Sequence, residues 1–262
     1  MKIESFEGIV LTETNYSESS KILNVLTNDR GVIGVMSKGC RNMKSKLRGV
    51  SRKLVYGTFH VYYKENGLST LIGVDLINSF SKTMMDLERI SFSLYLLDLV
   101  NQVVKQNDDN EIFELLKDTL LKIEDGLNPF VLTNILELKL LDYLGVRPSI
   151  DACSICGSDK GIVTLSSDSG GYVCRNCFSN EGYVSEKTIK MIRMYYYVEI
   201  KNITKLDVSD EVSAEINHFL DMYYERYTGL YLKSKSFINK VSSILINLIR
   251  IIQGYKSKLF CN

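Results

Sequence analysis

Residues 54–80, LVYGTFHVYYKENGLSTLIGVDLINSF, decide the fold of the first part of the chain. Two runs rich in aromatic and branched residues, 54–63 and 68–80, lie on either side of the pair Asn66-Gly67. An Asn-Gly pair between two such runs is a strong hairpin signal, because both residues tolerate the positive φ of a tight reversal. The stretch therefore predicts two antiparallel strands.

Three more strand-like segments lie upstream, at residues 6–16, 21–27 and 32–37, and turn residues separate them. Five strands in about 80 residues, with a longer insertion between the third and the fourth, predict an OB-fold barrel over residues 1–80. Periodicity alone would also permit an SH3-like barrel.

The insertion between the third and fourth strands is strongly basic. Residues 37–53 read SKGCRNMKSKLRGVSRK and contain no acidic residue. Its cations are candidate DNA-binding residues: Lys38, Arg41, Lys44, Lys46, Arg48, Arg52 and Lys53. A flexible basic loop can follow a phosphate backbone, and the aromatic residues between 56 and 63 could stack on bases. The alternatives are a solvated surface for the loop and barrel core for the aromatic residues.

Downstream of the barrel, apolar residues recur every three or four positions, which is the helical period. The pattern predicts a mostly buried helix from about residue 86 to 104 and a second from about 110 to 124. A third helix begins with Asn128 as N-cap and Pro129 in its first turn, and Gly145 ends it.

Helices resume further along, with an apolar stripe over 189–196, a helix capped by Ser209 and a last helix over 237–252. Residues 81–150 and 184–262 therefore predict an all-helical domain. The predicted fold class is α+β, because this domain follows a barrel.

Two CxxC pairs interrupt the helical pattern, Cys153 with Cys156 and Cys174 with Cys177, and the spacer between them has room for one hairpin. Four thiolates in this arrangement can surround a tetrahedral ion. Such a site leaves no position for a reacting water, so it indicates structural Zn²⁺ in an inserted module over residues 151–183. A disulfide pair, bound iron with the same ligands, and a thioredoxin-like redox pair are the alternatives.

Composition narrows the function classes. The chain has 262 residues, a net charge of +1 and 45% apolar residues, without an apolar run long enough to span a membrane. The opening residues MKIESFEGIV lack an apolar signal segment, so we expect a cytoplasmic protein. The two histidines, His60 and His218, fall in no metalloprotease or deaminase motif, and no P-loop occurs. We therefore expect no enzyme.

An ordered set of short motifs resembles the RecO family of bacterial recombination mediators, over about residues 3 to 240. In the first part these are GIVL at 8–11, YSE at 16–18, KIL at 21–23, LT at 26–27, Gly31, KG at 38–39, Arg41 and KS at 44–45. In the second part they are ELKLL at 137–141, LG at 144–145, Pro148, CSICG at 153–157, GGY at 170–172, Gly229, LKS at 232–234 and Phe237. The chain departs from the family at residues 52–54, where many members have a polar residue, proline and an aromatic, and in its tail after about residue 240.

The resemblance implies an OB-fold followed by a helical domain with a four-cysteine zinc insert. It also implies binding of single- and double-stranded DNA and annealing of complementary strands in RecF-pathway repair and recombination. With RecR, such a protein helps RecA load onto strands coated by single-strand-binding protein, whose acidic C-terminal tail the helical domain contacts. A nucleoid-associated location follows. The alternative is a zinc-containing interaction scaffold with little direct affinity for DNA.

Overall fold

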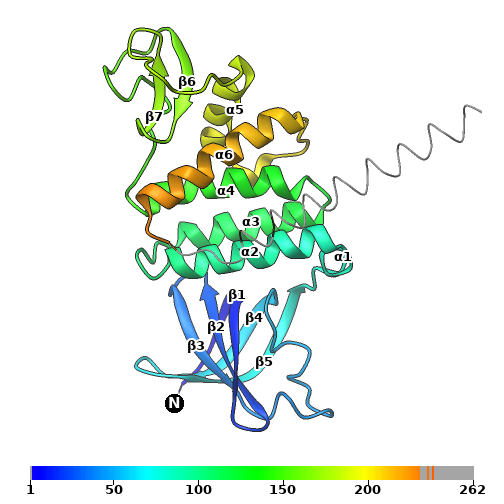
Figure 1. The fold of residues 1–262 in the computed structure, drawn as a ribbon. Coiled ribbons are helices and arrows are strands. Elements are labelled where there is room, and N and C mark those ends of the chain that lie inside the picture. The colour runs from blue at the N-terminus through cyan, green and yellow to red at the C-terminus, as the bar shows by residue number, and fades with distance from the viewer. Residues whose placement is uncertain (1, 231–234, 236–237, 239–262) are drawn as a thin grey trace, which may run out of the picture.

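Residues 2–78 form a closed barrel in the computed structural model, which describes residues 2–230, 235 and 238. The strands, blue to cyan in Figure 1, are β1 (Lys2–Tyr16), β2 (Ser20–Thr27), β3 (Val32–Ser37), β4 (Tyr56–Tyr63) and β5 (Ser69–Asn78). Around the barrel they follow the order β1-β2-β3-β5-β4, with β3 parallel to β5 and the other pairs antiparallel. This is the strand order of an OB-fold, as predicted, and it excludes the SH3-like alternative.

Strand β1 is long enough to pair with two neighbouring strands, β4 and β2. From Lys2 to Ile9 it pairs with β4, and from Gly8 to Tyr16 it pairs with β2. A register shift between Val10 and Thr12 bends the strand along its pairing with β2. The bend helps to close the barrel.

Alternate residues of the strands fill the barrel. The fully buried ones include Val10, Leu23, Val25, Val35, Phe59 and Val61. Phe59 and Tyr56 are buried, which confirms the core interpretation for these two aromatic residues. Tyr62 is three residues from Phe59, so it points to the opposite face of the strand, and it is 41% exposed.

The last two predicted strands extend slightly too far. β4 begins at Tyr56 because Leu54 has a φ of 65°, outside the extended region. β5 ends at Asn78, shortly before Phe80 adopts a φ of 49°. Phe80 then precedes α1 (Ser81–Met85), a short helix that the sequence pattern did not predict.

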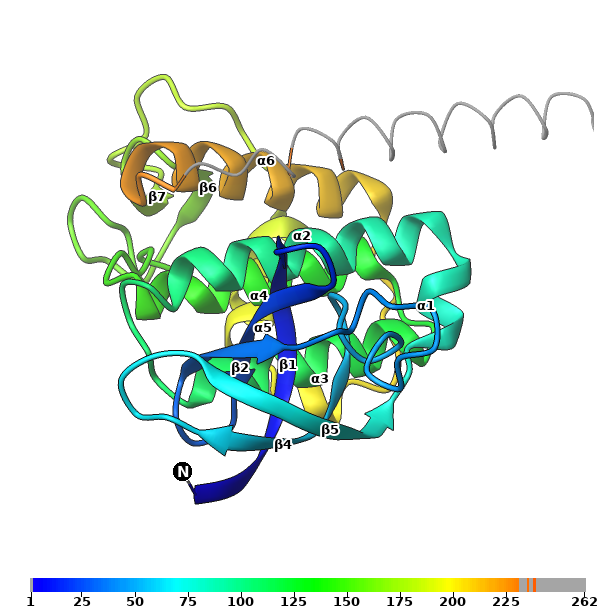
Figure 2. The same ribbon diagram turned by 90° about the horizontal axis from the view of Figure 1, so that it is seen from below.

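The remaining elements are α2 (Leu87–Val103), α3 (Glu111–Glu124), α4 (Pro129–Tyr143), α5 (Glu186–Tyr197), the short 3₁₀ helix η1 (Ile200–Asn202) and α6 (Asp210–Tyr227). Figure 1 shows α2 and α3 directly above the barrel, α4 and α6 above them, and a small hairpin at the far end. Figure 2, from below, shows the helices covering one end of the barrel. The N-caps predicted at Asn128 and Ser209 are confirmed, since both side chains accept backbone N–H groups of their helices.

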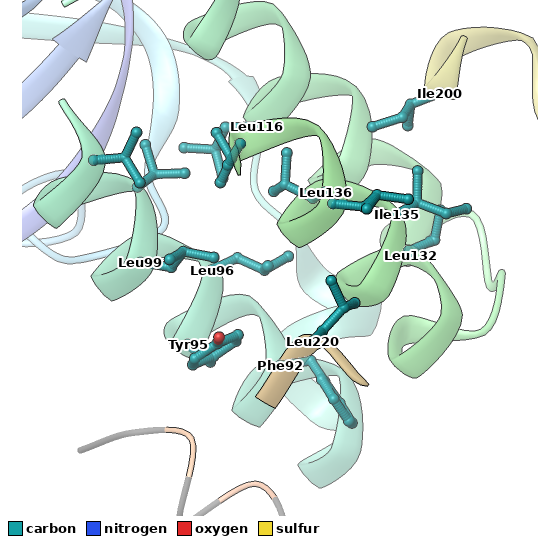
Figure 3. Close-up of a cluster of buried hydrophobic side chains, with 14 of the residues drawn as sticks. Phe92, Tyr95, Leu96, Leu99, Leu116, Leu132, Ile135, Leu136, Ile200 and Leu220 are labelled. Carbon is teal, nitrogen blue, oxygen red and sulfur yellow. The ribbon is translucent and has the colours of Figure 1, made fainter. Parts of the chain in front are cut away.

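Helix α4 is the centre of the helical layers. It is buried on nearly every side and contacts α2, α3, α5 and α6. Figure 3 shows Leu132, Ile135 and Leu136 of α4 among side chains of the neighbouring helices, including Leu96 and Leu99 of α2. The same buried cluster continues into the barrel through residues such as Ile9 and Leu26, so barrel and helices share one core.

A buried ion-pair network ties the end of the described chain to this core. Lys235 Nζ lies 2.8 Å from a carboxylate oxygen of Glu137 on α4 and 2.5 Å from one of Asp221 on α6. The hydroxyl of Tyr95 also donates to Glu137. Apart from the buried Ile238, the helix predicted over 237–252 lies outside the described residues.

Candidate metal centre and nucleic-acid interface

The cysteine segment folds as the single hairpin that its spacer predicted. Strand β6 (Ile162–Ser166) pairs antiparallel with β7 (Gly171–Cys174), and the hairpin stands at the end of the molecule farthest from the barrel (Figure 1). One CxxC pair precedes β6, and the other begins at the last residue of β7. The hairpin thereby returns the second pair to the first.

Each pair turns back on itself through backbone hydrogen bonds. In the first, the N–H of Gly157 donates to the carbonyl of Cys153 at 2.8 Å. Gly157 has a φ of 72°, which suits glycine and lets the turn close without strain. In the second, the N–H groups of Cys177 and Phe178 donate to the carbonyl of Cys174 at 3.0 and 2.9 Å. Both turns point their sulfurs inward.

The four sulfur atoms gather around one point. The Sγ atoms of Cys153, Cys156, Cys174 and Cys177 all lie within 4.8 Å of one another. Two of them, from Cys156 and Cys174, are 3.7 Å apart, close to the ~3.8 Å between sulfurs that bind one ion at 2.3 Å in a tetrahedron. The cysteines are free thiols, since 3.7 Å far exceeds a disulfide bond. The four residues therefore fit a metal ion.

Backbone N–H groups favour the thiolate form of one of these four cysteines, Cys153. Burial raises the pKa of Cys153, but N–H groups of Cys156, Cys174 and Ile155 point at its sulfur and lower the pKa overall, to about 6. The N–H of Cys174, for example, lies 3.4 Å from this sulfur. Thiolates are the form that binds metal.

Polar contacts fasten the module to the helices. The carboxylate of Asp151, two residues before the first cysteine, accepts from Arg147 at 3.3 Å, Arg193 at 3.2 Å and the hydroxyl of Tyr197 at 2.8 Å. The hydroxyl of Tyr172 in β7 donates to the carbonyl of Ile189 in α5. The module is therefore docked on α5.

The backbone of the basic loop, residues 37–53, is held to the barrel by hydrogen bonds. Its ends are joined by a buried hydrogen bond between the hydroxyls of Ser37 and Ser51, at 2.7 Å. The N–H of Arg41 donates to the carbonyl of Ser19 in the β1–β2 turn at 2.8 Å. Between these points the chain forms successive turns, and Cys40 is 2% exposed. The glycines of the loop allow it to be mobile or turned, and the structure shows it turned.

Most cations of the loop are exposed to solvent: Lys38, Arg41, Lys44, Lys46, Arg48 and Lys53. Of these, Arg41 also donates from Nη1 to the carbonyl of Ser17 in the β1–β2 turn at 3.1 Å. Arg52 is half-buried and donates from Nε to the carbonyl of Gly49 at 3.2 Å. Among the described residues, none of these seven cations forms an ion pair with an acidic side chain. The structure therefore brings the predicted DNA-binding residues together on one loop, and places them at the barrel, away from the cysteines (Figure 1).

Sequence reasoning missed a Ser–His–Asp chain on the outside of the barrel. The ring of His60 lies between Ser5, with Oγ to Nδ1 at 2.7 Å, and Asp75, with Oδ2 to Nε2 at 2.8 Å. The three residues sit on adjacent strands, and the β1–β4 register places Ser5 opposite His60. The Asp75 side chain is 83% exposed, so solvent screens the carboxylate that a catalytic relay would need. His60 and His218 both lie at the surface.

No helix in the described ranges is both long and apolar enough to cross a membrane.

Comparison with known proteins agrees with this architecture. The family model "Recombination protein O N terminal" matches residues 1–80, and "Recombination protein O C terminal" matches residues 84–236. A DNA repair protein RecO of Bacillus pumilus is 34% identical over 242 residues, which cover 91% of this chain and 94% of that protein. The proteins of that name from Listeria monocytogenes serotype 4a and Bacillus subtilis are each 33% identical, over 91% of this chain and 95% and 94% of their own. The barrel, the helical layers and the four-cysteine hairpin are therefore those of a member of the RecO family of DNA repair proteins.

Proposed function

We propose that this protein is a non-enzymatic, DNA-binding mediator of DNA repair and homologous recombination in the RecF pathway. The observation that carries the proposal is the basic loop, whose seven cations share one pinned segment and pair with no described carboxylate. Unpaired cations bind phosphates without first breaking an internal ion pair. The loop residues 38, 41, 44, 46, 48, 52 and 53 are thus the proposed DNA contacts.

The pinned backbone strengthens this proposal. A disordered loop would lose conformational entropy on binding, whereas a folded loop presents its charges at little further cost. The contacts are to phosphates, so they favour binding of both single- and double-stranded DNA without sequence preference. A protein that holds two strands by their backbones leaves the bases free to pair, which supports annealing of complementary strands.

For the cysteine module we propose one structural Zn²⁺ bound by Cys153, Cys156, Cys174 and Cys177. Four thiolate ligands favour zinc, and such a site stabilises the fold that supplies the ligands. The inward-facing sulfurs leave the ion a structural role. The proposed domains are residues 1–80 for DNA binding, 81–150 with 184–262 for the helical domain, and 151–183 for the zinc module.

Membership in the RecO family supports the proposed partners. We propose that the protein acts with RecR to help RecA load onto strands coated by single-strand-binding protein, whose C-terminal tail contacts the helical domain. The site of action is then the nucleoid in the cytoplasm.

The test is annealing of fluorescently labelled complementary strands that are coated with cognate single-strand-binding protein, with and without RecR. We expect the protein to accelerate annealing without ATP and RecR to change the rate. A protein that binds its partners but gives no gel shift with DNA at moderate salt would instead be an interaction scaffold, which contradicts the proposal.

A further inference from the structure

Three apolar side chains are exposed where the barrel joins the helices. Met84 and Met85 of α1 are 43% and 90% exposed, and Leu87 at the start of α2 is 63% exposed. We name Met84, Met85 and Leu87 the apolar ledge. Exposed apolar side chains grouped in this way indicate an interaction surface more than isolated ones do.

The ledge touches the basic loop. The guanidinium of Arg52 donates from Nη1 to the sulfur of Met84 at 3.4 Å, while its Nε holds the carbonyl of Gly49 within the loop. Figures 1 and 2 both show α1 on the same side of the molecule as the chain between β3 and β4. A polyanion that lies on the loop therefore has the ledge beside it.

The ledge is also held in place. Glu124 at the end of α3 accepts from the N–H of Lys82 at 3.0 Å, the N–H of Thr83 at 2.8 Å and the hydroxyl of Thr83 at 2.7 Å. These bonds cap α1 and fix its orientation relative to α3. The positions of Met84 and Met85 on the surface are therefore fixed by the contacts of α1.

Two aromatic residues of β4, Tyr56 and Phe59, are buried and offer no contact surface. Tyr62 is exposed, and it lies near the start of the loop, because Met36 of β3 is aligned with Thr70 of β5 and Thr70 with Tyr62. At the other end of the loop, which carries Arg52, the exposed apolar side chains beside the cations are those of methionine and leucine.

We propose that the apolar ledge receives unstacked bases of single-stranded DNA whose phosphates lie on the basic loop. The inference rests on the proposed function and deepens it. Charge complementarity favours this occupant, because Arg52 joins the ledge to the basic loop, whose cations attract a polyanion. Thioether and aliphatic side chains are soft apolar surfaces that contact base faces of any sequence. Duplex DNA keeps its bases stacked, so the ledge favours single strands.

The test uses the full-length chain and two probes of equal length, an ordinary single-stranded oligonucleotide and one made of abasic sugar-phosphate units. The double variant Met84→Ser/Met85→Ser should bind the ordinary oligonucleotide at least about fivefold more weakly, while its affinity for the abasic probe stays that of the wild type. The slope of log affinity against log salt should not change, because no phosphate contact is lost. Leu87→Ser should act in the same direction.

A matched control is Met222→Ser. The side chain of Met222 is 42% exposed, and its helix, α6, is separated from the barrel by other helices (Figure 1). This variant should leave the affinities for the ordinary and the abasic oligonucleotide unchanged. Thermal unfolding should show that all variants remain folded. Equal losses for the ordinary and abasic probes, or loss of a protein partner with DNA affinity intact, would overturn the inference. If the wild type binds neither probe, the proposed function itself fails.

Discussion

The basic loop and the four-cysteine module are both segments that interrupt regular structure, yet they hold their chemical groups in opposite ways. In the loop, the backbone is fastened inside by Ser37 and Ser51 while the cations point to solvent. In the module, the sulfurs point at one another, within 4.8 Å, and Cys153 and Cys174 are buried. Groups that face outward are available to another molecule, whereas groups that face inward hold the segment itself together.

This difference predicts which measurement each segment controls. Substitutions in the loop should change DNA affinity and leave stability nearly unaltered, because exposed cations contribute little to folding. Substitutions in the module should change stability and metal content and leave the DNA affinity of the barrel nearly unaltered. Variants of each segment can show whether DNA affinity depends on the loop, and stability and metal content on the module.

The largest effect is expected from Cys153→Ser. Loss of one buried ligand should abolish stoichiometric zinc, from about one ion per chain, and destabilise the module by at least about 3 kcal/mol. Metal analysis and thermal unfolding measure this, and a strong chelator added to the wild type should reproduce it. Cys40→Ser is the matched control, a buried cysteine outside the module that should leave zinc content intact. A Cys153→Ser protein with full metal content would refute the proposed ligand set.

A smaller effect is expected where the module meets the helices. Asp151→Asn removes the charge that Arg147 and Arg193 share and should lower the free energy of unfolding by about 1 kcal/mol, since the groups are partly exposed. Urea unfolding followed by a probe on the module should show the shift. Asp159→Asn, an exposed residue of the same module, should have no effect. An identical response of the two variants would show that the Asp151 network does not fasten the module.

An effect of similar size, which depends on pH, concerns the cap that supports α1 beside the loop. Burial raises the pKa of Glu124, but hydrogen bonds from Thr83 and the N–H of Lys82 outweigh it and hold the pKa below its ordinary value of 4.5. A lowered folded-state pKa means that the carboxylate stabilises the fold above about pH 4.5, and that this contribution is lost as the pH falls through the folded-state pKa. Glu124→Gln should therefore cost about 1 kcal/mol at pH 7.

That cost should shrink below pH 4, as chemical unfolding at a series of pH values would show. Glu114→Gln, with a more exposed side chain on the same helix, serves as the control. A pH-independent cost for Glu124→Gln would mean that its charge does not cap α1.

The sequence predicted the parts of the fold that depend on local pattern. The hairpin at Asn66-Gly67, the start of α4 at Pro129 and the helix after Ser209 follow from turn and cap chemistry. The hairpin connection is longer than a tight reversal, since it runs over residues 64–68 and only Gly67 of the pair has a positive φ. The two CxxC motifs also predicted the cluster of sulfurs, because the spacer between them has room for the hairpin that brings the pairs together.

The features that the sequence did not predict depend on contacts between residues that are distant in the sequence. Helix α1 is capped by Glu124, 41 positions beyond Thr83, so no local signal marks it. The His60 chain requires the register of three strands. The glycines Gly39 and Gly49 were expected to make the loop mobile or turned, and the bond between Ser37 and Ser51 that folds it is not visible in a pattern.

The central claim is that the basic loop binds the phosphates, and the salt dependence of single-stranded DNA affinity tests it most directly. The triple variant Lys44→Ser/Lys46→Ser/Arg48→Ser is compared with Lys160→Ser/Arg175→Ser/Lys187→Ser, which removes the same charge from exposed positions on the module and α5. We expect the loop variant to bind more weakly and its log–log salt slope to fall in magnitude by about 2, while the control variant keeps the wild-type slope. Equal slopes for the two variants would contradict the account.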